Sequence, residues 1–167
     1  RMVMRRELEK LALYVGPGGR VSEEDAMASL AEGSALDLET ALSAAVAGDV
    51  VTADRALESA MAEGAASVQI VRGAMRHIQR LHQAAAAMAA GAPLKAAVDG
   101  LRPPVFFKAR PAFERALSLW SLHALEAAGQ ALLDAERRTK TTGIPDETIA
   151  RSAVMALARE AVRARRG

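Results

Sequence analysis

The three histidines, His77, His82 and His123, are the side chains best suited to bind a metal or to move a proton at neutral pH. His77 and His82 are five residues apart, about 140° around a helix of 3.6 residues per turn, so one helix cannot direct both at one metal. No His-Glu-x-x-His motif is present, and His123 falls on the polar side of another helical pattern. We therefore expect ordinary histidines at the surface or at the edge of the core.

No other set of residues has the spacing of a catalytic or nucleotide-binding site. The sequence has no cysteine and no Gly-x-Ser-x-Gly motif, which excludes disulfides, thiolate chemistry and cysteine-bound zinc and gives no sign of a serine nucleophile. The segment Gly16-Pro17-Gly18-Gly19-Arg20 joins two helical patterns and lacks a lysine, so it predicts an interhelical turn rather than a phosphate-binding loop. We expect no cofactor and no catalysis by this chain alone.

Two clusters of basic residues could contact phosphate groups. Arg137, Arg138 and Lys140 end one helical pattern, where cations also suit the negative end of the helix dipole. Four arginines, Arg159, Arg163, Arg165 and Arg166, lie near the C-terminus. A solvated helix end is the commoner explanation of either cluster.

The composition shows which kind of fold must hold these residues in place. The chain has 167 residues, of which 51% are hydrophobic, 25% charged and 3% aromatic, and its formal charge is +2. Alanine is the commonest residue and the best helix former, whereas strands favour aromatic and β-branched residues. The composition therefore predicts an all-α protein of one domain, or of one domain plus a fragment.

Nothing in the sequence predicts a membrane or secretory segment. The longest run without charge, residues 81–94, is too short to cross a bilayer, and the N-terminus has no apolar signal segment. We expect a cytoplasmic protein with no membrane contact. Because the sequence begins with Arg1, we also expect it to be a piece of a longer protein.

Glycine, proline and capping residues divide the chain into an expected bundle of seven or eight helices. Ser22 is an expected N-cap, and Gly33 and Ser34 mark the expected end of its helix and a domain boundary. Phe106 and Phe107 follow two prolines and are expected to pack into the core. The expected helices cover residues 3–15, 22–33, 37–47, 50–63, 67–90, a short turn within 93–111, 111–137 and a last helix from Pro145.

Several short stretches, in this order, resemble one known family. They are Glu7-Leu8-Glu9-Lys10-Leu11, Val21-Ser22-Glu23-Glu24-Asp25, Asp37-Leu38, Pro103-Pro104-Val105-Phe106-Phe107-Lys108, Leu119-Trp120-Ser121 and Glu136 with Lys140-Thr141. Over residues 7–158 the chain thus resembles the C-terminal part of the delta subunit of the bacterial DNA polymerase III clamp loader.

The resemblance implies a non-catalytic role in DNA replication. Residues 1–33 would be the end of the ATPase-lid domain, and residues 34–167 the helical collar that assembles with the other loader subunits. The family opens the sliding clamp through an N-terminal domain that is missing here, and primer–template DNA lies beneath the collar. Arg137, Arg138 and Lys140 are then the candidates to face this DNA, through phosphate contacts only, because no aromatic residue accompanies them.

Three other functions compete with this one. A helical-repeat scaffold that binds a peptide in an apolar groove is supported by residues 42–64, although no repeat period is present. A helix-turn-helix DNA-binding regulator would need a compact basic recognition helix, which we do not find. For an all-α enzyme, no set of catalytic residues can be named.

Overall fold

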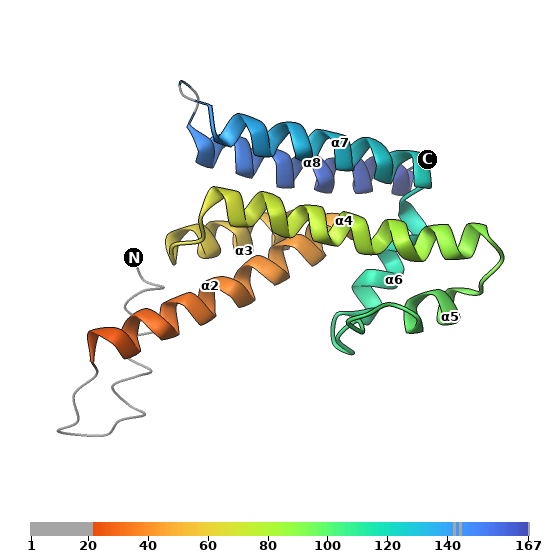
Figure 1. The fold of residues 1–167 in the computed structure, drawn as a ribbon, viewed down its shortest axis with the longest axis horizontal. Coiled ribbons are helices and arrows are strands. Elements are labelled where there is room, and N and C mark those ends of the chain that lie inside the picture. Colours follow the sequence, from red (N-terminus) through yellow and green to blue (C-terminus); the bar gives the residue numbers. More distant parts are fainter. Residues whose placement is uncertain (1–21, 142, 144, 167) are drawn as a thin grey trace.

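The computed structural model describes residues 22–141, 143 and 145–166, and these residues form an all-α bundle (Figure 1). The expectation of seven or eight helices and no strand is confirmed for this part of the chain. The predicted helix over residues 3–15 and the turn at residues 16–20 lie outside the described residues. The helices are α2 (Glu23–Val46), α3 (Val50–Ala62), α4 (Ser67–Ala89), α5 (Leu94–Asp99), α6 (Arg110–Leu119), α7 (Leu122–Thr139) and α8 (Asp146–Arg166).

Most helix ends follow the capping residues in the sequence. The Ser22 side chain accepts a hydrogen bond from the Asp25 backbone N–H at 3.0 Å, so α2 begins where predicted. Gly64 and Gly91 have φ angles of +103° and +111°, a conformation that costs glycine little, and they follow the ends of α3 and α4.

The prediction that a helix ends near Gly33 is wrong. Gly33 lies inside the continuous helix α2, and Asp37 begins no new helix. A lone glycine costs a helix interior only about 1 kcal/mol relative to alanine. The last turns of α2 are buried in the core through Ala41, Leu42 and Ala45, and this burial favours the unbroken helix. The assignment of residues 1–33 and 34–167 to two domains stays a prediction.

Helix α4 is the central element of the bundle. The antiparallel pair α7 and α8 packs on one side of it and α2 on the other, while α5 and α6 lie beside its C-terminal half (Figure 1). Helix α3 packs on α2 and α8. The larger fully buried side chains come from nearly every helix and are Leu42, Leu57, Ile70, Leu81, Leu125, Leu132 and Val154. The apolar side of α4 faces the core through Val71, Ile78 and Leu81, and its polar side faces solvent through Gln69, Arg72 and Arg76.

The predicted helix over residues 111–137 is two helices that meet at Trp120. The Ser121 side chain caps α7 by accepting from the Ala124 backbone N–H at 3.1 Å. The buried Trp120 indole donates from Nε1 to the Val46 carbonyl at 2.8 Å, which fastens this corner to the end of α2. The bend is stable because the indole keeps a hydrogen bond in the core.

The prediction that Phe106 and Phe107 pack into the core is also wrong. Their side chains are 61% and 72% exposed, on the loop of residues 100–109 that joins α5 to α6. Val98 and Leu101 are the apolar side chains that fill the core here. Arg80 donates to the Pro103 carbonyl at 2.7 Å, which holds the loop against the surface of α4 and leaves the aromatic pair outside.

Candidate functional site

Two histidines on α4 contact carboxylates of different helices. His77 Nε2 lies 2.8 Å from Glu39 Oε1 of α2, and His82 Nε2 lies 3.6 Å from Glu126 Oε1 of α7. Within the described residues, no three histidine, aspartate or glutamate side chains gather as metal ligands would. The hydrogen bond from His77 lowers the pKa of Glu39 below its ordinary value, and the nearby Arg76 and Arg80 act in the same direction.

The three predicted DNA-facing residues lie at the C-terminal end of α7 but not on one face. Arg137 pairs with Asp134 at 3.9 Å, and Lys140 Nζ lies 3.9 Å from Glu136 Oε2. Arg138 lies on the opposite side, among the residues that line a groove between α7 and α8. Of the three predicted residues, Arg137 and Lys140 lie outside the lining of that groove.

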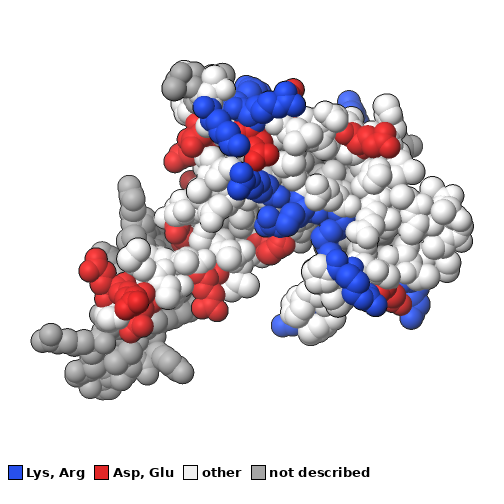
Figure 2. All heavy atoms as spheres, in the orientation of Figure 1, with Lys and Arg blue, Asp and Glu red and all other residues white. Residues whose placement is uncertain are grey.

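A row of arginines on α4 continues this basic surface. Arg72, Arg76 and Arg80 are four residues apart, so their side chains leave the same side of the helix, about 6 Å apart along its axis. Arg72 Nε bonds Glu136 Oε2 at 2.9 Å, the carboxylate that Lys140 also approaches. Figure 2 shows Lys and Arg side chains gathered in a diagonal band over α7 and α4.

We call Lys140, Arg72, Arg76, Arg80 and Arg102 the basic band. The sequence contains a signal of it, since the arginines of α4 follow a strict four-residue spacing with no acidic residue on the same stripe. Taken alone, that stripe indicates only the solvent side of a helix. Arg102 cannot be assigned to the band from the sequence, because the loop brings it there from outside the helical pattern.

The basic band ends in a groove between α4 and the loop of residues 100–109. The groove encloses about 490 Å³, and Arg76, Arg80 and Arg102 line it together with Phe106. Glu39 is the one carboxylate among its lining residues, and that carboxylate is engaged by His77. This lining would suit an anionic ligand with an aromatic or apolar part.

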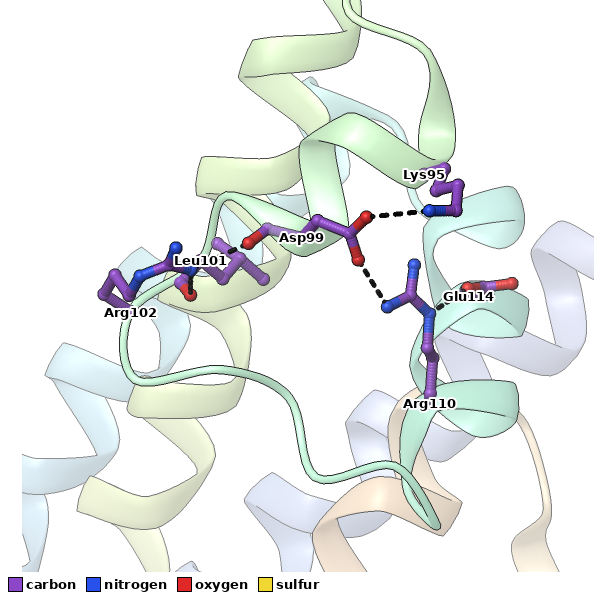
Figure 3. Close-up of polar contacts among 6 residues, drawn as sticks. All are labelled: Lys95, Asp99, Leu101, Arg102, Arg110 and Glu114. Carbon is purple, nitrogen blue, oxygen red and sulfur yellow. Dashed lines mark hydrogen bonds and ion pairs between the residues drawn. The ribbon is translucent and has the colours of Figure 1, made fainter.

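Ion pairs hold both ends of this loop in place (Figure 3). Asp99, at the end of α5, accepts from Arg110 Nη1 at 2.6 Å and from Lys95 Nζ at 3.3 Å. Arg102 Nη1 donates to the carbonyls of Asp99 and Leu101, each at 2.7 Å. The pKa of Asp99 is lowered, first by the hydrogen bond from Arg110 and then by that from Lys95.

A second surface feature is an apolar groove between α7 and α8. It encloses about 700 Å³, and seven alanines of the two helices line it together with Leu132 and Ile149. His123, Arg138, Glu160 and Arg163 supply charged or polar groups to its lining. Because alanine side chains are short, another helix can approach the two backbones closely here. We call this feature the α7–α8 groove.

Comparisons with protein families, with curated proteins and with solved structures found nothing that matches this chain. No helix among the described residues is long and apolar enough to cross a membrane.

Proposed function

We propose that this chain is the collar part of a delta subunit of the bacterial DNA polymerase III clamp loader, the complex that loads the sliding clamp onto primed DNA. The chain takes part without catalysis, in the cytoplasm. It binds the other loader subunits through its collar domain, residues 34–167. The sliding clamp is contacted only by the N-terminal domain of the delta subunit, which is not part of residues 1–167, and primer–template DNA is bound within the full complex.

The α7–α8 groove is the observation that carries this proposal. A subunit that works by assembly needs an apolar surface that stays open in the isolated chain. Ala127 and Ala131 of α7 are exposed and, with Ala156 of α8, offer a wide apolar strip that no described segment covers. A helix of a neighbouring loader subunit is the occupant that this strip fits.

The basic band supports the DNA side of the proposal. Phosphate contacts come mainly from Arg and Lys. Arg137 directly follows Glu136 in α7, and Lys140 and Arg72 of the band both contact the Glu136 carboxylate. The side chains of Arg137, Lys140 and Arg72 are 76%, 63% and 56% exposed, so a DNA backbone can reach them.

Assembly with loader subunits tests the proposal directly. The chain is mixed with the other clamp-loader subunits of the same organism, and the mass of the eluted complex is measured by light scattering after size exclusion. We expect one defined complex, which Ala131→Arg abolishes because it places a large charged side chain in the α7–α8 groove. Gln130→Arg adds the same charge on the exposed side of α7 outside the groove, and it should leave the complex intact.

The same groove favours one alternative, a helical scaffold that binds a peptide and has no part in replication. Such a scaffold would not join the loader subunits. The control is that the other loader subunits are folded and assemble with one another. If they never co-elute with this chain, and the full-length protein of this sequence also fails to join them, the clamp-loader proposal is wrong.

A further inference from the structure

Phe106 and Phe107 form an exposed aromatic pair on the loop of residues 100–109. They are 61% and 72% exposed, and their ring centroids lie 4.9 Å apart. Two adjacent phenylalanines with most of their surface in water are unfavourable for a folded chain unless something covers them. The pair is therefore a surface for bulky apolar groups of a partner.

The loop presents these rings in a fixed position. Arg102 donates to the carbonyls of Asp99 and Leu101, and Arg110 pairs with the Asp99 carboxylate from the far end of the loop (Figure 3). A loop fastened at both ends loses little further freedom when a ligand binds. The loop is thus prepared for binding without rearrangement.

One wall of the neighbouring groove, formed by α4, is basic. Arg76 and Arg80 are one helical turn apart, about 6 Å along the axis, and both line the groove of about 490 Å³. Arg80 donates to the Pro103 carbonyl, and its guanidinium has further N–H groups for a ligand. The Glu39 carboxylate is engaged by His77, so this wall favours an anion.

The opposite wall, formed by the loop, is mostly apolar. Pro103, Pro104, Val105 and Phe106 line it, and Phe107 follows directly in the chain. A ligand that fills the groove therefore needs anionic groups toward α4 and bulky apolar groups toward the loop.

An extended peptide has this division of its side chains. Its successive side chains point to opposite faces, and those on one face repeat about every 6.6 Å. That repeat is close to the spacing of about 6 Å between the arginines of α4. Carboxylates at every second position would then meet Arg76 and Arg80, and the residues between them would face the loop.

We propose that this groove binds an extended segment of a partner protein in which acidic and bulky apolar residues alternate. Its carboxylates pair with Arg76 and Arg80 through charge-assisted hydrogen bonds, and its apolar side chains cover Phe106 and Phe107. A nucleic-acid strand fits less well, because its successive bases stack in parallel whereas the two rings are tilted by 58° to each other. This binding goes beyond the proposed function and does not depend on it.

The test measures fluorescence anisotropy of the labelled peptide Asp-Leu-Asp-Phe-Asp-Leu-Asp, titrated with the whole chain at low salt. We expect the double variant Phe106→Ala/Phe107→Ala to weaken binding about tenfold, because the apolar side chains lose their contact surface. Arg76→Glu should weaken it by a similar factor, because it replaces an attraction with a repulsion. All three positions are exposed, so thermal melting of both variants should match that of the unmodified chain.

Two controls test the charge and the order of the side chains. Arg55→Glu makes the same change of charge on the exposed side of α3, outside both grooves, and should leave the affinity within about twofold. The peptide Asp-Asp-Asp-Asp-Leu-Phe-Leu has the same composition without the alternation and should bind more weakly. Equal affinity for the two peptides would overturn the proposal, as would unchanged affinity in the Phe106→Ala/Phe107→Ala variant.

Nucleic acid is the competing occupant and is measured in the same assay. Tighter binding of a labelled oligothymidylate than of the alternating peptide, lost in the same two variants, would overturn the peptide proposal. The assay uses the chain alone and needs no loader subunit, so its outcome is separate from the assembly experiment. A chain that joins the loader complex but does not bind the alternating peptide refutes only the peptide proposal.

Discussion

Two glycines inside helices differ in the space available for a side chain. A Cβ added to Gly73 of α4 would lie 2.8 Å from Leu42 Cδ1, whereas one added to Gly129 of α7 would meet no atom within 4 Å. Leu42 is buried in the core with 1% of its surface exposed, so it has little room to move. Gly73 thus allows α2 and α4 to pack closely, whereas the position of Gly129 has free space beside it.

Gly73→Ala should therefore destabilise the chain and Gly129→Ala should stabilise it. Overpacking at Gly73 costs about 1–3 kcal/mol, more than the gain in helix propensity. At Gly129 only that gain of about 1 kcal/mol remains. Urea denaturation followed by circular dichroism measures both free energies of unfolding. Equal effects of the same sign would show that the packing of α2 on α4 is not tight at Gly73.

The contact between Glu39 and His77 makes a pH-dependent contribution to stability. The hydrogen bond from His77 lowers the pKa of Glu39 below 4.5, so the folded state favours the carboxylate more than the unfolded state does. The stabilisation is thus present above pH 4.5 and disappears as the pH falls through the lowered pKa. Since the Glu39 side chain is 63% exposed, the whole effect is below about 1 kcal/mol.

Glu39→Gln should lower the free energy of unfolding slightly at pH 6 and by less at pH 3, because the stabilisation disappears as the pH falls through the lowered pKa of Glu39. Urea denaturation at the two pH values measures the difference. Glu126→Gln is a suitable comparison, because the Glu126 carboxylate lies 3.6 Å from His82 and should contribute less. An effect of Glu39→Gln that grows as the pH falls would contradict the assignment.

At the scale of the helices, short polar side chains decide where each element begins. Ser22, Asp49 and Ser121 accept hydrogen bonds from backbone N–H groups in the first turns of α2, α3 and α7. These positions can be found from the sequence because the interaction spans only three residues. The passage of α2 through Gly33 could not be found in this way, since it depends on what the rest of the helix packs against.

Ser121→Ala should destabilise the chain by about 1 kcal/mol, the usual value of a serine N-cap. Ser118→Ala serves as the control, because the Ser118 hydroxyl donates only to the Arg115 carbonyl within α6 and the residue is exposed. We expect its effect to stay within about 0.5 kcal/mol. Thermal melts of the two variants compare them directly. If they melt alike, the break between α6 and α7 does not depend on this cap.

At the scale of the whole molecule, the basic surface is assembled from three separate segments. The C-terminal end of α7 supplies Lys140, α4 supplies three arginines, and the loop after α5 supplies Arg102. Glu136 joins the first two segments by contacting both Arg72 and Lys140. The formal charge of +2 gives no hint of this band, because it depends on the positions of charges rather than on their sum.

Under the proposed function, replacing Arg137 and Lys140 by alanine in the full-length subunit should weaken DNA-dependent clamp loading. Arg138 is left unchanged, because it lines the α7–α8 groove. A protein that binds fewer phosphates also releases fewer counterions, so its DNA affinity should depend less steeply on salt concentration. Loading rates and DNA affinity between low and moderate salt measure both effects. Replacing Arg165 and Arg166 removes equal charge from the C-terminal end of α8 and is the control. Unchanged loading at moderate salt would remove Arg137 and Lys140 from the DNA interface.

The all-α class, most helix limits and the side of α4 that faces the core can be predicted from the sequence. These depend on propensity, capping and the 3.6-residue period, which act over neighbouring residues. The folded structure is needed to show that α2 runs through Gly33, that Phe106 and Phe107 stay outside the core, and that Arg102 joins the arginines of α4. Each of these results from packing between segments far apart in the chain. Val98 and Leu101 fill the core beside the loop, and the buried last turns of α2 favour a continuous helix.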